Sequence, residues 1–177
     1  HRLLTSGIIT LPDEDTCGRM YSMAPERFSE AGLGRYEISN FARPGFRCLH
    51  NLNYWRNGEY LGLGAGAHSY LDGVRSSNIP DPADYMARVQ DKGTAMDSRE
   101  KLSARAALGE ALMLGFRLTE GIDMSDYGSR YGISIQHEYG ETIKDLSKQG
   151  LMEIEGGRLK ITGRGILLSD EVFLKFL

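Results

Sequence analysis

Two stripes of apolar residues predict the strongest helices of the chain. Apolar residues recur at spacings of three and four between positions 102 and 116, and their neighbours are also largely apolar, which predicts a helix buried on most faces. A second stripe has charged residues opposite it, which predicts an amphipathic helix ending at Gly150. The stripes are Leu102, Ala106, Gly109, Met113 and Phe116, then Ile135, Tyr139, Ile143 and Leu146.

Residues 152–161 have the alternating pattern of a β-hairpin around a two-residue Gly156-Gly157 turn. In this register apolar residues face apolar ones and acids face bases, a match that a one-residue slip would destroy. The pairs are Met152 with Ile161, Ile154 with Leu159, Glu153 with Lys160, and Glu155 with Arg158. Thr162 should cap a final helix that runs to Leu177. Residues from about Glu100 onward therefore predict helices, a two-stranded wing and a helix, which is a winged-helix-like module.

The first part of the chain alternates helical and strand patterns. Asp13 is the predicted N-cap of a helix that reaches about Ala31. Pro25 removes a backbone donor, so this helix should kink or restart there, before Gly32 or Gly34 ends it. Residues 34–40 should form a strand whose end could face a site. Helix followed by strand is typical of α/β architecture.

Residues 41–97 predict smaller elements. A loop and a short helix should occupy residues 41–58, and strands should occupy residues 60–71, interrupted by glycines, and 74–79. Asp81 or Asp84 should begin a short helix near Pro80 and Pro82. Residues 91–97 are the best linker candidate, and the character of the sequence changes after them.

Composition and charge exclude several classes of protein. The 177 residues are too few for a complete TIM barrel, and 41% hydrophobic with 25% charged residues is typical of a globular chain. A net charge of −3 argues against a nucleic-acid partner, and residues 121–177 carry 7 Lys plus Arg against 9 Asp plus Glu, unlike a DNA-reading wing. No run of 18 apolar residues and no signal peptide pattern occurs, so we expect a cytoplasmic protein, peripheral to membranes at most.

The chain has two cysteines, Cys17 and Cys48. They allow at most one disulfide, and two thiols are too few to ligate an iron–sulfur cluster. Their spacing is unlike that of a zinc site, so we expect both to be packing residues. The sequence begins at His1 rather than Met, which suggests that it follows a truncation.

Residues 50–55, His-Asn-Leu-Asn-Tyr-Trp, gather an imidazole, two amides and two large aromatic rings. In a helix, His50 and Tyr54 would share a face. One interpretation is a structural histidine whose hydrogen bonds are satisfied within an aromatic packing segment. The other is a binding edge for a flat aromatic ligand, with His50 as a candidate axial ligand of haem iron.

Residues 62–69, Gly-Leu-Gly-Ala-Gly-Ala-His-Ser, fit the dinucleotide pattern G-x-G-x-x-A poorly, because no helix pattern follows. Small residues allow close approach, either of a ligand or of a neighbouring backbone. Both interpretations stay open from the residues alone.

Three motifs in order then resemble a known family. They are Tyr-Glu-Ile-Ser-Asn-Phe-Ala-Arg-Pro-Gly at 36–45, the segment 50–55 and the segment 62–69, and the resemblance continues to residue 162. They look like the late barrel segments of HemW-type proteins, which are radical S-adenosylmethionine (SAM) proteins close to oxygen-independent coproporphyrinogen III oxidase. Pro25 departs from the family's usual helix pattern, but it lies away from every motif.

This resemblance implies the last elements of a partial (β/α)6 barrel in residues 1–95, followed by the family's mostly helical, winged-helix-like C-terminal domain in residues 96–177. The family holds a [4Fe-4S] cluster on a C-x-x-x-C-x-x-C loop and cleaves SAM reductively. That loop is absent from this chain. The resemblance therefore implies cofactors of a longer parent, and this chain alone would generate no radical.

The resemblance also implies site residues. The H-N-x-x-Y-W motif is characteristic of the haem-chaperone branch, and it implies a haem site with His50 as candidate iron ligand. The glycine-rich segment implies SAM contacts; only a backbone contact carries over at His68, where the oxidase has an apolar residue. The implied sets are His50, Asn51, Tyr54 and Trp55 for haem, and Gly66, Ala67 and His68 for SAM. We expect His50 and the glycine-rich strand to form one wall of a cavity.

The implied function is haem binding and delivery of haem to acceptor haemoproteins. One alternative is the oxidative decarboxylation of coproporphyrinogen III to protoporphyrinogen IX. Another is a winged-helix interaction module without a ligand, whose acidic surface would suit protein contacts better than DNA.

Overall fold

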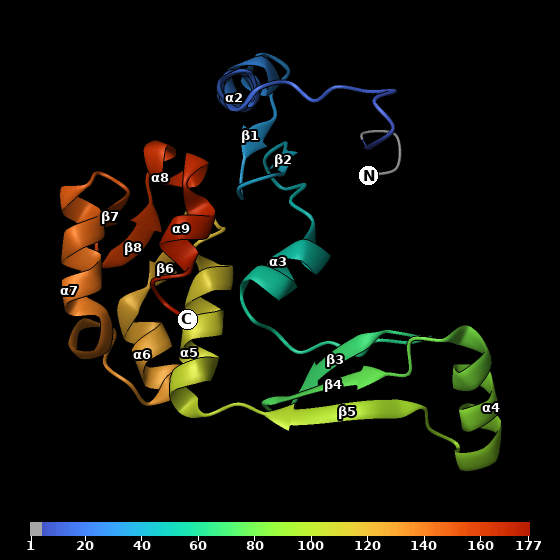
Figure 1. The fold of residues 1–177 in the computed structure, drawn as a ribbon. Coiled ribbons are helices and arrows are strands. Elements are labelled where there is room, and N and C mark those ends of the chain that lie inside the picture. The colour runs from blue at the N-terminus through green and yellow to red at the C-terminus, as the bar shows by residue number, and fades with distance from the viewer. Residues whose placement is uncertain (1–4) are drawn as a thin grey trace. The chain divides into compact units, whose positions relative to one another are not determined.

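A computed structural model describes residues 5–177 of the chain (Figure 1). The described residues form two compact units, which are divided between Arg47 and Cys48. Residues 1–4, with which the first predicted domain begins, lie outside the described residues. The domain boundary near residue 95 stays a prediction. No helix among the described residues is long and apolar enough to cross a membrane.

The first unit is built on helix α2 (Glu14–Glu30). Asp13 is its N-cap, as predicted: the carboxylate accepts a hydrogen bond from the Thr16 amide at 2.7 Å, and this bond lowers the pKa of Asp13. Gly32, at φ +73°, follows the last turn and ends the helix. The predicted restart at Pro25 is wrong, since the helix is continuous through it. Pro25 removes one backbone donor, and the bonds on either side keep the helix intact.

The predicted strand over residues 34–40 is wrong in its second half. Strand β1 (Gly34–Arg35) pairs antiparallel with β2 (Phe41–Ala42), and a turn joins them. The fully buried Glu37 closes that turn, because its carboxylate accepts hydrogen bonds from the Ser39 amide at 2.9 Å and from Asn40 Nδ2 at 2.6 Å. Polar residues that can bond to their own backbone favour turns over strands.

The second unit begins with helix α3 (Leu49–Trp55), the predicted short helix. A three-stranded antiparallel sheet in the order β3-β4-β5 follows, and helix α4 connects β4 to β5 (Figure 1). Asp81 caps α4, as predicted. The bounds are β3 (His68–Leu71), β4 (Val74–Asn78), α4 (Pro82–Lys92) and β5 (Met96–Lys101).

Two predictions in this region are wrong. Only the end of the run 60–71 is a strand, and residues 62–67 form a loop. The predicted linker over residues 91–97 consists of the end of α4, a short turn and the start of β5. Strand β5 has no alternating apolar pattern because all six of its residues are exposed. It is an edge strand that is held by its pairing with β4.

Helix α5 (Ala104–Gly115) was predicted to be buried on most faces, and this is only partly correct. Its buried residues are Leu108, Gly109, Ala111, Leu112 and Gly115, whereas residues 104–106 in its first turn are exposed. The hairpin register is confirmed in full, and Gly156 and Gly157 both have positive φ, as its turn requires. The predicted two-stranded wing has a third strand, because Ile122 pairs with Leu159. The other bounds are β6 (Ile122–Asp123), α6 (Met124–Tyr131), α7 (Ile135–Lys148), β7 (Met152–Glu155) and β8 (Arg158–Ile161).

The core of this unit contains the predicted stripe of α7, with all four of its apolar residues buried. The prediction of a single final helix is wrong, because α8 (Gly163–Leu167) and α9 (Ser169–Phe173) are separated at Leu168. Thr162 caps α8 as predicted, accepting a hydrogen bond from the Gly165 amide at 3.0 Å. After the break, Val172 and Phe176 are buried.

Candidate functional site

Helix α3 carries the histidine motif. Leu52 is the buried residue of this helix, and α3 packs against α5. His50 and Tyr54 share a face, as predicted, and their rings meet edge to face with centroids 4.8 Å apart. Tyr54 in turn meets the ring of Tyr60 at 4.8 Å. The motif therefore begins a continuous row of three rings.

His50 lies at the exposed beginning of α3. Its side chain is exposed, and the preceding Leu49 is 80% exposed. The interpretation of His50 as a satisfied packing histidine is therefore not supported. An exposed imidazole beside an exposed apolar side chain can meet a large flat ligand that also coordinates through a metal.

The end of α3 lines a cavity of about 390 Å³. Four aromatic residues contribute to its wall, namely Tyr54, Trp55, Tyr60 and Tyr70. Of the seven predicted site residues, Tyr54 and Trp55 line this cavity, whereas His50, Asn51 and residues 66–68 are absent from its lining. The structure thus divides the histidine motif between an exposed start and a cavity at its end.

An ion pair forms the polar part of the cavity wall. The Arg75 guanidinium donates to both carboxylate oxygens of Glu110, at 2.9 and 3.0 Å, and to Glu100 at 2.7 Å. These hydrogen bonds raise the pKa of Arg75, and the bond to Glu100 contributes most. Burial raises the pKa of Tyr60. Because the cation is already paired, the cavity suits an apolar flat group better than an anion.

Trp55, which lines the cavity, is also stacked against a cation. The Arg117 guanidinium lies 4.2 Å from the centroid of the Trp55 ring, within the range of a cation–π interaction. The indole Nε1 of Trp55 is buried, and it has no hydrogen-bond partner in the described part of the chain. The ring is thus fixed by stacking and packing.

The glycine-rich segment is a loop, so the expected side-chain-free strand is wrong. Its glycines are explained by the chain's own packing: a Cβ at Gly62 would lie 2.0 Å from the His68 carbonyl oxygen, and Gly66 has φ +67°. The Gly66 amide donates to the Ile79 carbonyl at 2.8 Å, and the Ala67 carbonyl accepts from the Asn78 amide at 2.9 Å. His68 begins β3 with an exposed side chain. The SAM contacts of Gly66, Ala67 and His68 stay a prediction.

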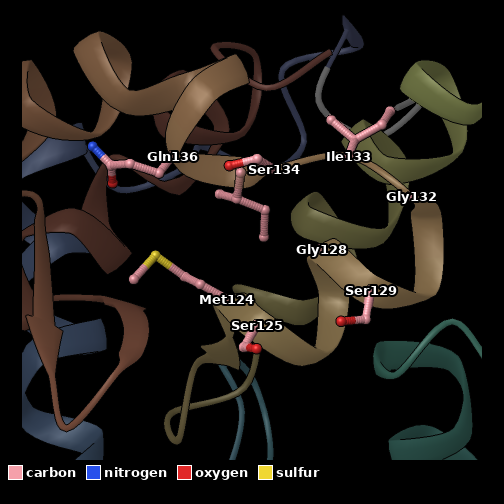
Figure 2. A pocket seen from close by; sticks show the side chains of 9 residues that line it. Met124, Ser125, Gly128, Ser129, Gly132, Ile133, Ser134 and Gln136 are labelled. Atoms are coloured by element: carbon pink, nitrogen blue, oxygen red, sulfur yellow. The ribbon is translucent and has the colours of Figure 1, made fainter.

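A further cavity, of about 400 Å³, lies between α6 and the first turn of α7. Figure 2 shows Met124 and Ser125 from α6 and Ser134 and Gln136 from the start of α7 around it. None of its lining residues is charged or can ligate haem iron through an imidazole. This cavity therefore adds nothing to the haem interpretation.

The described residues do not fit a metal cluster. No group of three or more His, Cys, Asp or Glu side chains that could hold a metal ion occurs between residues 5 and 177. Cys17 and Cys48 are both free and exposed, so the expectation that they are packing residues is wrong. A [4Fe-4S] cluster would need ligands that this chain does not supply.

Most of the cavity wall was not predicted as part of a site, including Tyr60, Tyr70 and Arg75. A signal for two of them exists in the sequence, because Asp72-Gly73 is a strong hairpin turn, and it pairs Tyr70 with Arg75. That pairing brings the arginine beside an aromatic residue. No local pattern indicates Tyr60, which reaches the sheet through a single bridge to Tyr70.

Comparison with known proteins gives the family. Residues 102–168 match the family model of the HemN C-terminal domain. The haem chaperone HemW of Bacillus subtilis (strain 168) is 33% identical over 177 residues, which are 100% of this chain and 47% of that protein. The haem chaperone HemW of Lactococcus lactis is 34% identical over 97% of this chain and 45% of its own length. The chain is a HemW/HemN-like C-terminal portion.

A solved structure agrees with this assignment at the level of the fold. Coproporphyrinogen III oxidase HemN from Escherichia coli, described as a radical SAM enzyme, matches with a TM-score of 0.74. The match covers 94% of the HemW/HemN-like chain and 42% of the oxidase, at 17% sequence identity. The α/β class is thereby confirmed. The HemW/HemN-like chain spans about half the length of the curated relatives it matches.

Proposed function

We propose that the HemW/HemN-like chain supplies part of the haem-binding surface of a haem chaperone, which passes its haem to acceptor haemoproteins. Haem is the cargo in this proposal. Relatives named as haem chaperones, 33–34% identical over almost the whole chain, support it. A partial barrel followed by a winged-helix-like domain is part of the same proposal.

The exposed His50 on α3 is the observation that carries the proposal. Iron coordination needs a nitrogen lone pair that the porphyrin can approach, and an exposed imidazole meets this need. The ring of Tyr54 lies edge-on against His50 and orients it. A site at an exposed surface also suits a cargo, since an acceptor must reach the haem to take it.

Asn51 and Trp55 complete the proposed haem site. Asn51 is half-buried directly after His50, and Trp55 lines the aromatic cavity at the other end of the helix. Both residues are assigned by the motif. We propose that SAM and the [4Fe-4S] cluster belong to the whole protein, with SAM near Gly66, Ala67 and His68.

A haem titration of the full-length protein tests the proposal. Absorbance in the Soret region should saturate with haem, and the His50→Ala variant should bind more weakly. His137→Ala is the matched control, because His137 is an exposed histidine on α7. Equal affinities of wild type and His50→Ala would remove His50 as the iron ligand and overturn the proposal.

Two further assays separate the alternatives. When an apo-haemoprotein is added to the haem-loaded protein, the Soret band of the loaded protein should disappear and the spectrum of the haem-bound acceptor should appear. This result would support delivery of haem. Release of CO2 from coproporphyrinogen III by the reconstituted full-length protein would instead support the oxidase alternative. Absence of binding to either porphyrin would leave the interaction module.

A further inference from the structure

The C-terminal end of helix α3 is held by the domain that follows it in sequence. The Arg130 guanidinium donates from Nη1 to the Arg56 carbonyl at 2.9 Å and from Nη2 to the Asn57 carbonyl at 2.7 Å. These two carbonyls belong to the C-cap residue of α3 and to the residue that follows it, and the planar fork fixes both their position and their direction. A cation at this end also complements the helix dipole.

Two neighbouring contacts reinforce the same end. Asn57 Nδ2 donates to the Tyr131 hydroxyl at 2.9 Å, and the Arg117 guanidinium stacks on the Trp55 ring at 4.2 Å. We refer to Arg117, Arg130 and Tyr131 as the α3 anchor. All three residues lie within the segment 102–168 that matches the HemN C-terminal domain.

The N-terminal end of α3 is held much less. Its N-cap residue, Cys48, makes no side-chain capping hydrogen bond, and Leu49 is 80% exposed. His50 therefore lies at the exposed end of a helix whose other end is fixed. The direction of the helix axis, and with it the place of the imidazole, depends on the anchored end and on the buried Leu52.

The effect of losing the anchor can be estimated from helix geometry. His50 precedes Trp55 by five residues, so its Cα lies about 7.5 Å along the axis, and a tilt of about 20° would move it by roughly 2–3 Å. Such a tilt would move the α3 residues of the proposed haem site relative to Tyr60 and Tyr70, which lie outside α3 on the wall of the aromatic cavity. A haem that contacts both α3 and this wall would lose part of its contacts.

We propose that Arg130, supported by Tyr131 and Arg117, is a positioning residue through which the HemN C-terminal domain sets His50 for haem coordination. This inference rests on the proposed function of His50 and adds to it a role for the C-terminal domain. It predicts that haem affinity depends on a residue that does not touch haem.

The test compares haem titrations of the full-length protein and three variants. Arg130→Met keeps most of the side-chain length and removes every donor; it should weaken haem binding about tenfold to a hundredfold, as loss of an outer-shell support does at metal sites. Arg130→Lys should recover part of the affinity, because an ammonium reaches one carbonyl instead of two. Arg164→Met, an exposed arginine on α8, is the matched control and should bind as wild type does.

A double-mutant cycle with His50→Ala separates positioning from general damage. If Arg130 acts through His50, Arg130→Met causes no further loss of haem affinity in the His50→Ala background. An equal loss in both backgrounds, or wild-type affinity of Arg130→Met, would overturn the positioning role. An unchanged affinity of His50→Ala alone would instead overturn the proposed function.

A milder variant keeps the test decisive where Arg130→Met does not fold, as judged by near-ultraviolet circular dichroism. Tyr131→Phe removes the hydrogen bond from Asn57 and little else. It should weaken haem binding severalfold and shift the Soret maximum toward that of His50→Ala. A folded Tyr131→Phe with wild-type affinity and spectrum would contradict the proposal.

Discussion

Replacing glycine by alanine should have opposite effects in two helices of the second unit. Gly109 lies within α5 and Gly140 within α7. In both helices alanine gains about 0.8–1.0 kcal/mol of intrinsic helix propensity over glycine. What differs is the atom that the new Cβ would meet, so packing decides the sign.

At Gly109 the new Cβ would lie 2.4 Å from the Phe176 carbonyl oxygen. This is a backbone atom that also accepts a hydrogen bond from the buried Tyr139 hydroxyl at 3.1 Å, so the chain must shift and the bond is strained. Overpacking costs about 1–3 kcal/mol, and a lost hydrogen bond about 0.5–1.5 kcal/mol. Gly109→Ala should therefore destabilise the unit by about 1–3 kcal/mol after the propensity gain.

At Gly140 the nearest atom is Gln136 Nε2, 2.9 Å from the new Cβ. Gln136 is exposed, and the end of its side chain can move away at little cost. Gly140→Ala should therefore keep most of the propensity gain and stabilise the unit by up to about 1 kcal/mol.

Thermal unfolding followed by circular dichroism checks the pair. Each kcal/mol corresponds to roughly 2–4 °C in a domain of this size, so Gly109→Ala should lower the Tm by several degrees and Gly140→Ala should raise it by about 2–4 °C. A Gly109→Ala variant as stable as wild type would refute the packing of the chain end on α5. A Gly140→Ala variant less stable than Gly109→Ala would refute the reasoning altogether.

Two further predictions concern the stability of α6. Burial raises the pKa of Tyr127 to about 12, above its value of about 10 in the unfolded chain. The stabilisation that this shift gives to the folded state is therefore complete below pH 10. About 2–3 kcal/mol of the free energy of unfolding is lost as the pH rises from there to about 12. Urea unfolding of Tyr127→Phe should show a smaller fall over this range, and equal falls would contradict the assignment. Asp123 caps α6 by accepting from the Ser125 and Asp126 amides, so Asp123→Ala should cost about 1 kcal/mol in the same assay while Asp123→Asn retains most of the stability.

The hairpin over residues 152–161 was predictable because its information is local. A two-glycine turn and four matched cross-strand pairs allow one register, and the structure has that register. Strand β5 shows the opposite case. Its residues are exposed and mostly charged, so no apolar pattern marks it, and only pairing with β4 makes it a strand. Sequence patterns predict elements that bury a face, and they miss elements defined by a partner.

The candidate site follows the same rule. The shared face of His50 and Tyr54 comes from helical spacing, so the sequence was sufficient to predict it. The bonds from Arg130 to the end of α3 join residues 73 and 74 positions apart, and no local pattern indicates them. The glycine-rich segment was misinterpreted as a strand because its glycines serve positive φ angles and a close approach to the His68 carbonyl.

The ligand of the haem iron is the most direct test of the account. Electron paramagnetic resonance of the ferric haem complex of the full-length protein should show histidine coordination in wild type. The His50→Ala variant should lose that signal, and added imidazole should restore it, because the exposed end of α3 leaves room for a free ligand. An unchanged signal in His50→Ala would contradict the central claim that this histidine binds the iron.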